Sequence, residues 1–146
     1  MKRTRVAVLH GINLGALDRR PAGHYGGLTL MALEQRIEVF ARELELDVSF
    51  FQTDHEGEYV QELHRAPDLA DGLVLNPGAW THYAWSLRDA LEICGLPAVE
   101  VHLSDVDHRE PFRRVSVLEG VRVARVSGQG VEGYREALVR LKRELS

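Results

Sequence analysis

The chain has 146 residues, a length typical of one domain with a sizeable core. Its hydrophobic content of 45% and charged content of 27% are ordinary for a globular protein. The net charge of −4 gives no electrostatic footprint for nucleic acid or an anionic membrane, and no stretch is apolar enough to span a bilayer. We therefore expect a single domain over residues 1–146, located in the cytoplasm, with no nucleic acid and no membrane among its partners.

The first apolar run, residues 6–9, predicts a strand that is buried on both faces. A glycine-rich connection follows over residues 10–27. A loop of this length is more often functional than idle, so we expect a lid at about residues 15–28. Apolar residues at helical spacing over residues 30–44 then predict an amphipathic helix, and residues 48–51 predict the second strand.

The segment from Thr53 to Glu56 has the form of a capping box and predicts the start of the next helix, which Tyr59, Val60 and Leu63 continue. The run over residues 73–75 predicts a third buried strand, which breaks at a Pro-Gly turn. Apolar positions over residues 84–94 predict the helix after it, and Gly95 is a plausible stop for that helix.

Residues 98–103 predict the fourth strand, and residues 104–116 an irregular polar connection. Residues 121–126 predict the fifth strand, and the stripe over residues 134–145 predicts the last helix. This alternation predicts an α/β fold, a doubly wound five-stranded parallel sheet with right-handed crossovers, and favours the flavodoxin-like order 2-1-3-4-5.

Polar side chains follow three of the expected strands. Asn13 comes after the first strand, Asn76 and His82 after the third, and His102 and Ser104 at the end of the fourth. In such sheets, ligands bind outside the carboxyl ends of the strands at the switch point, which strands one and three flank. We therefore expect these side chains to converge on one crevice.

Glu100 and His102 are two residues apart on an expected strand, so they face the same side of the sheet. A buried carboxylate is costly unless it is paired, and Glu100 could accept a hydrogen bond from the His102 ring, which would fix its tautomer. The alternative is a satisfied buried ion pair without chemistry. The pair alone does not decide between them.

Arg19 and Arg20 precede Tyr25 in the expected lid. Arginines in a surface loop are usually solvated, and a lone tyrosine is usually a packing residue. A close guanidinium would, however, favour the phenolate if the loop closes and excludes water.

Two further patterns do not lead to a cofactor or a metal. The glycines from Gly128 to Gly133 match a dinucleotide-binding fingerprint, but no strand and acidic residue follow at the required distance, so a tight turn is favoured. A possible metal cluster matches no common zinc or calcium spacing. Its members are His102, Asp105, Asp107 and His108.

Several segments together resemble one known family. They are Gly11-Ile12-Asn13-Leu14, Arg20 through Tyr25-Gly26, Gln52 through Glu58, Asn76-Pro77-Gly78-Ala79 with Thr81-His82, Leu87-Arg88-Asp89-Ala90, Glu100-Val101-His102-Leu103-Ser104, Arg109-Glu110, Phe112-Arg113, Gly130-Val131 and Gly133-Tyr134. Over nearly its whole length the chain resembles the type II 3-dehydroquinate dehydratases. The resemblance implies a homododecamer, a tetramer of trimers, that converts 3-dehydroquinate reversibly to 3-dehydroshikimate through an enolate, in the shikimate or quinate pathway, without cofactor or metal.

The resemblance also implies roles for individual residues. Tyr25 would remove the proton next to the ketone, with Arg20 favouring its phenolate, and Asn13 would help to hold the water that stabilises the enolate. His102, oriented by Glu100, would protonate the departing hydroxyl. The implied substrate-binding groups are Asn76, His82, the backbone region of Leu103 and Ser104, Arg113, and Asp89, which would reach a neighbouring subunit's site.

The chain departs from the family after its first strand, where His10-Gly11-Ile12-Asn13 replaces the usual Asn-Gly-Pro-Asn. Losing the proline is expected to loosen the turn that aims Asn13, and His10 adds a titratable ring near the crevice. These changes bear on rate and pH dependence more than on reaction type. They leave open a second hypothesis, a non-catalytic module on the same fold that binds a flavin or another small anion.

Overall fold

Five short strands form one sheet in a computed structural model that describes residues 2–146. All neighbouring strands are parallel, and their order is β2-β1-β3-β4-β5, so the predicted order is confirmed. The central strands are buried on both faces, as their continuous apolar runs predict, while the edge strands β2 and β5 are partly exposed. The strands are β1 (Arg5–His10), β2 (Asp47–Gln52), β3 (Gly72–Asn76), β4 (Ala98–His102) and β5 (Ala124–Ser127).

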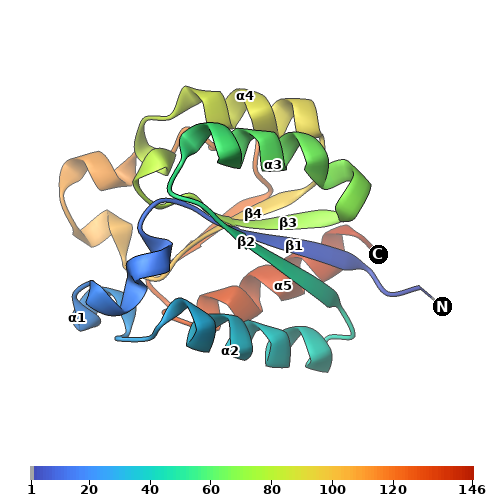
Figure 1. The fold of residues 1–146 in the computed structure, drawn as a ribbon, viewed down its shortest axis with the longest axis horizontal. Helices are drawn as coiled ribbons and strands as arrows, with labels where there is room; N and C mark the ends of the chain where they lie inside the picture. The colour runs from blue at the N-terminus through green and yellow to red at the C-terminus, as the bar shows by residue number, and fades with distance from the viewer. Residues whose placement is uncertain (1) are drawn as a thin grey trace.

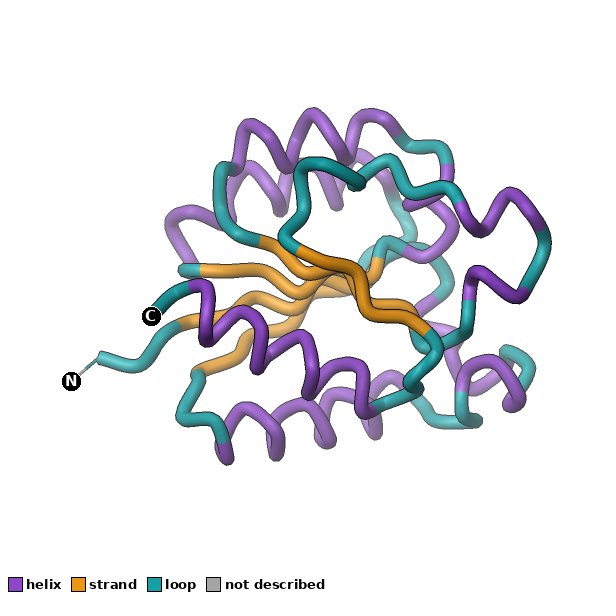
Figure 2. The backbone as a smooth tube through the Cα atoms, turned by 180° about the vertical axis from the view of Figure 1, so that it is seen from behind, coloured by secondary structure: helices purple, strands orange, loops and turns teal. Residues whose placement is uncertain are grey.

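Helices cover both faces of this sheet, as Figure 1 shows. On one face lie α3 (Glu56–Leu69) and α4 (Trp85–Cys94), and on the other lie α2 (Leu30–Glu43) and α5 (Glu132–Glu144). The view from behind in Figure 2 shows the same three layers. No helix within residues 2–146 is long and apolar enough to cross a membrane.

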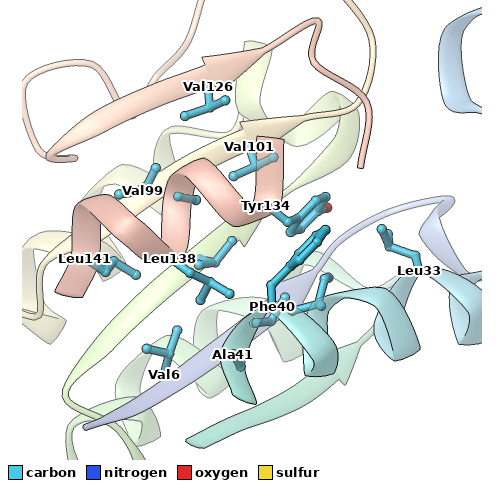
Figure 3. Packing of buried hydrophobic residues seen from close by; sticks show 14 of the residues in the cluster. Val6, Leu33, Phe40, Ala41, Val99, Val101, Val126, Tyr134, Leu138 and Leu141 are labelled. Carbon is cyan, nitrogen blue, oxygen red and sulfur yellow. The ribbon is translucent and has the colours of Figure 1, made fainter. Parts of the chain in front are cut away.

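Each face of the sheet has its own hydrophobic core, because alternate residues of a strand point to opposite faces. Val6 and Val8 of β1 pack toward α2 and α5, while Ala7 and Leu9 pack toward α3 and α4. Figure 3 shows the first core, in which Tyr134 and residues one and two turns further along α5 face the valines of β4 and β5.

The two termini lie at one end of the molecule, and the connections that follow β1, β3 and β4 lie at the other (Figure 1). These connections fold into short helical turns where loops were predicted. They are the 3-10 helices η1 (Leu14–Arg19), η2 (Gly78–His82), η3 (Val106–His108) and η4 (Pro111–Arg114), together with the single-turn helix α1 (Ala22–Tyr25).

Two boundary predictions are wrong. Residues 121–126 were predicted as the fifth strand, but Val121 and Arg122 donate their N–H groups to the Leu118 carbonyl, which closes a turn there. The capping box is also absent. The Thr53 hydroxyl accepts a hydrogen bond from the His55 N–H and donates one to Glu58, and α3 begins without a side-chain cap.

Candidate active site

Two turns at the carboxyl edge of the sheet pack backbone against backbone. Gly11 follows β1 and donates its N–H to the carbonyl of Asn76 at 2.8 Å. A Cβ on Gly11 would lie 2.7 Å from the Cα of Pro77, and one on Gly78 would lie 2.5 Å from the carbonyl oxygen of Ile12. Only glycine fits such a close approach, which brings the segment around Asn13 next to Asn76.

Polar side chains from β2 and from the loop after it hold the turn that carries Asn13. The backbone of Asn13 is left-handed, with φ of 71°, a conformation that asparagine tolerates better than most residues. The Asn13 N–H donates to Oδ1 of Asp54 at 2.8 Å, and the Gln52 amide donates to the same atom and to the Gly11 carbonyl. These three hydrogen bonds fix the turn that contains Ile12, so it does not depend on a proline at that position.

A cavity of about 190 Å³ opens where these turns meet the connections after β4. It gathers the predicted site residues with two exceptions, Glu100 and Asp89. The lining residues are Asn13, Leu14, Leu17, Arg20, Tyr25, Asn76, Gly78, Ala79, His82, His102, Leu103, Ser104, Val106, Phe112 and Arg113.

Asn76 is fixed on both sides at the end of β3. Its Oδ1 accepts the Gly78 N–H at 3.2 Å, and its Nδ2 donates to the hydroxyl of Tyr134 at 3.2 Å. Burial raises the pKa of Tyr134 to about 12, so this hydroxyl stays neutral at physiological pH. The orientation of the Asn76 amide is therefore independent of pH over the physiological range.

Glu100 lies behind the cavity with none of its side chain exposed, and the contact expected with His102 is present. Its carboxylate accepts hydrogen bonds from Nε2 of His102 at 2.5 Å, from the Thr81 hydroxyl at 2.5 Å and from the Ser116 hydroxyl at 2.7 Å. Burial alone would raise the pKa of Glu100, but these hydrogen bonds and the charge of His102 outweigh it and lower the pKa to about 2. The group is thus an ionised carboxylate held beneath the imidazole.

His82 lies beside His102 on the cavity wall, with the two rings stacked 6.3 Å apart. Its Nδ1 donates to the carbonyl of Val115 at 2.7 Å. Burial lowers the pKa of His82, the bond to Val115 opposes this effect, and the charges of His102 and Arg113 lower it further. The ring is therefore neutral near pH 7, and its Nε2 is left as a hydrogen-bond acceptor.

Tyr25 enters the cavity from α1, which buries none of its four residues. The guanidinium of Arg20 lies over the tyrosine ring, 4.2 Å from its centre. Arg109 donates from Nη1 to the phenolic oxygen at 2.6 Å and to the Ser104 hydroxyl at 3.2 Å. Two positive charges therefore flank this phenol.

Arg109 is a site residue that the sequence analysis did not select. It belongs to one of the segments that carry the family resemblance, but it lies in an irregular connection with no periodicity to relate it to Tyr25. Thr81 and Ser116 were missed for the same reason, because only the tertiary fold brings their hydroxyls to Glu100.

Asp89 lies outside the cavity of its own chain, on the exposed face of α4. It is flanked one turn away on either side by Trp85, which is 62% exposed, and Ile93, which is 71% exposed. The site of a single chain therefore forms without Asp89.

The residues considered as a metal cluster are paired separately. His108 bonds to Asp105 at 2.5 Å, and Asp107 binds Arg125 through both carboxylate oxygens at 3.1 Å. Within residues 2–146 the structure brings together no three histidine, cysteine or acidic side chains that could hold a metal ion.

Comparisons with known proteins agree with one another. A family model described as class II dehydroquinase matches residues 4–142. A 3-dehydroquinate dehydratase of Thermotoga petrophila is 45% identical over 141 residues, which cover 97% of this chain and 96% of that protein. A 3-dehydroquinate dehydratase of Syntrophotalea carbinolica is 44% identical over 136 residues, which cover 92% of each protein. The crystal structure of a type II dehydroquinase from Butyrivibrio crossotus matches with a TM-score of 0.91 at 35% identity, over 96% of this chain and 98% of that chain. By sequence and by structure, the chain belongs to the class II dehydroquinase family.

Proposed function

We propose that this protein is a type II 3-dehydroquinate dehydratase, which removes water reversibly from 3-dehydroquinate to give 3-dehydroshikimate in the shikimate or quinate pathway. The observation that carries the proposal is one cavity lined by both a tyrosine held between two guanidinium groups and a histidine backed by an ionised carboxylate. Loss of water next to a ketone needs a base and an acid on separate positions of the substrate, and these two side chains supply them.

Tyr25 acts as the base in this proposal. An N–H of Arg109 points at its oxygen, and Arg20 lies over its ring, so the phenolate that must form is stabilised by positive charge on two sides. The phenolate takes the proton from the carbon next to the ketone. The electron pair left behind moves onto the ketone oxygen and gives an enolate.

The enolate needs hydrogen-bond donors aimed at its oxygen. We assign to Asn13 the role of holding a water against this oxygen, because the hydrogen bonds to Asp54 and Gln52 fix its turn at the cavity wall. When the enolate collapses, the bond from carbon to the departing hydroxyl breaks. His102 gives that hydroxyl a proton, and water leaves.

Glu100 supports the acid step without touching substrate. Its hydrogen bond to Nε2 orients the His102 ring and leaves Nδ1 as the ring nitrogen that can exchange a proton with the substrate. Neutral His82 and fixed Asn76 are suited to bind substrate hydroxyls, as are the backbone and side-chain groups of Leu103 and Ser104.

Arg113 is the group we assign to the substrate carboxylate, because a planar guanidinium can bind a carboxylate through two hydrogen bonds. In this structure Arg113 pairs with Glu110, which is largely exposed. A bound substrate would therefore compete with Glu110 for the same guanidinium.

We further propose that residues 1–146 act as one catalytic domain with a lid at about residues 15–28. This segment carries Arg20 and Tyr25. Leu17 anchors its first part in the core, whereas α1 meets the core only through the partly buried Tyr25. Closure of the lid over a bound substrate would exclude water and so strengthen the charge interactions around the phenolate.

The assembly implied by the family resemblance, a homododecamer built as a tetramer of trimers, is part of the same proposal. Asp89 would contribute to the site of a neighbouring subunit from the exposed face of α4. Trp85 and Ile93, the large exposed side chains one turn on either side of it, support a contact there, since exposed apolar surface can mark a protein interface.

The direct test mixes the protein with 3-dehydroquinate and follows the ultraviolet absorbance of the conjugated enone product. We expect an increase with wild type, and little or none with Tyr25→Phe or His102→Ala, although both variants should still bind product. Folded wild-type protein that gives no increase would contradict the proposal. A yellow purified protein, or tight anion binding without turnover, would instead support the non-catalytic module.

A further inference from the structure

Glu100 has a fourth neighbour, Arg122, which lies between η4 and β5. Nε of Arg122 is 3.2 Å from Oε1 of Glu100, and only 13% of the arginine side chain is exposed. Nε and Nη1 are buried, and within residues 2–146 neither has a hydrogen-bond partner. The contact is therefore one of charge against charge, not an aligned hydrogen bond.

The turn around Leu118 positions both Ser116 and Arg122 next to Glu100. The Ser116 hydroxyl donates to Glu100 and accepts the Leu118 N–H at 3.2 Å, and the Arg122 N–H donates to the Leu118 carbonyl at 3.0 Å. Val123 then joins the sheet by donating to the Ala98 carbonyl at 2.8 Å. The backbone thus fixes the arginine against Oε1 of Glu100, whereas His102 bonds to Oε2.

We propose that Arg122 is a positioning residue for His102, which acts through Glu100 to make the imidazole a stronger acid. The inference rests on the proposed function, in which His102 protonates the departing hydroxyl. Glu100 and Arg122 together carry no net charge, so protonating His102 gives the buried group of Glu100, Arg122 and His102 a net positive charge. Without Arg122 the carboxylate charge would act on the imidazole alone and would hold its proton more tightly.

Other titratable groups also face this buried group and must be held constant in a test. They are His82 from η2, Arg113 from η4, Tyr59 from α3 and Arg125 from β5, the register partner of Glu100. None of them contacts Arg122 through a hydrogen bond or ion pair. Variants at Arg122 therefore change one charge and leave these neighbours in place.

The test compares three variants by nuclear magnetic resonance titration of the His102 ring in the free protein. Arg122→Met removes the charge and should raise the titration midpoint of His102 by about one pH unit, while Arg122→Lys should restore it. Arg36→Met is the control, because Arg36 pairs with Glu132 on the exposed surface and makes no contact with Glu100. It should leave the midpoint within a few tenths of a unit.

An unchanged midpoint in Arg122→Met, or an equal change in Arg36→Met, would overturn the proposal. If Arg122→Met does not fold, Arg122→Gln takes its place, since it keeps hydrogen-bond donors and lacks the charge. The titration needs no turnover, so a wild-type protein inactive on 3-dehydroquinate would refute the proposed function and leave this test intact.

Activity gives the second measurement. An enzyme that needs a protonated acid loses kcat as the pH rises through the pKa of that acid. The alkaline limb of kcat for Arg122→Met should therefore move to higher pH by the same amount as the titration midpoint, with KM nearly unchanged because Arg122 lies outside the cavity. A fall in activity with no movement of the limb would show a structural role only.

Discussion

Replacing Glu100 by glutamine keeps the shape of a fully buried side chain and removes its charge. The wild-type carboxylate accepts three hydrogen bonds, one each from His102, Thr81 and Ser116, and lies against Arg122. A glutamine amide presents one oxygen and one NH₂ group to these partners, so at least one donor would lose its acceptor. Breaking a buried charge pair in this way costs about 3–5 kcal/mol of stability.

The pH dependence gives a sharper magnitude for the same variant. The pKa of Glu100 is lowered from its ordinary value of 4.5 to about 2, which corresponds to a stabilisation of about 3 kcal/mol. A lowered carboxyl pKa contributes stability that is complete above pH 4.5 and is lost as the pH falls toward 2. About 2 kcal/mol of it should be gone at pH 3, because the unfolded chain is protonated first.

Urea unfolding of wild type and Glu100→Gln at pH 7 and at pH 3 measures this effect. Other carboxyl groups titrate in both proteins and cancel, so the stability difference between the two should shrink by about 2 kcal/mol at pH 3. Glu132→Gln, which breaks an exposed pair with Arg36, should change stability by less than about 1 kcal/mol. A difference between wild type and Glu100→Gln that stays constant from pH 7 to pH 3 would refute an ionised Glu100.

Three further predictions follow from the site and its supports. Gly11→Ala should lower the free energy of unfolding by about 3 kcal/mol, since its Cβ meets the Pro77 backbone, whereas Gly57→Ala, whose Cβ meets nothing, should change it by less than about 1 kcal/mol in thermal unfolding. Asp89→Asn should reduce kcat without changing the mass of the assembly in light scattering; unchanged kcat would argue against a role in a neighbouring site. His82 should titrate below pH 6.5 by nuclear magnetic resonance. Because burial lowers its pKa in the folded protein, the free energy of unfolding should fall as the pH drops below 6.5. A midpoint at or above 6.5 would contradict the burial argument.

The architecture could be predicted from the sequence because each buried strand is a continuous apolar run. The apolar runs of β1, β3 and β4 and the helical stripes between them leave few topologies for a parallel sheet. The edge strand β5 was misplaced, because its start is set by a turn onto the Leu118 carbonyl that no local pattern reveals. Apolar content alone does not tell a strand from a turn that leads into one.

The candidate site was predictable where its residues follow strand ends, and not elsewhere. Asn76 and His102 occupy positions that the fold class fixes in space, so their convergence follows from the strand order. Arg109 and Arg122 lie in irregular segments, where the distance to Tyr25 or to Glu100 depends on turns that only the folded chain defines. Long-range contacts of this kind have no period in the sequence.

The proposed acid, His102, and the proposed base, Tyr25, lie on elements that the rest of the fold holds to very different degrees. His102 belongs to a central strand and is held by a buried carboxylate, whereas Tyr25 belongs to a four-residue helix with no fully buried residue. An inhibitor that binds mainly to His102 and its neighbours therefore meets a preformed surface. One that relies on the tyrosine depends on a short helix that meets the core only through the partly buried Tyr25.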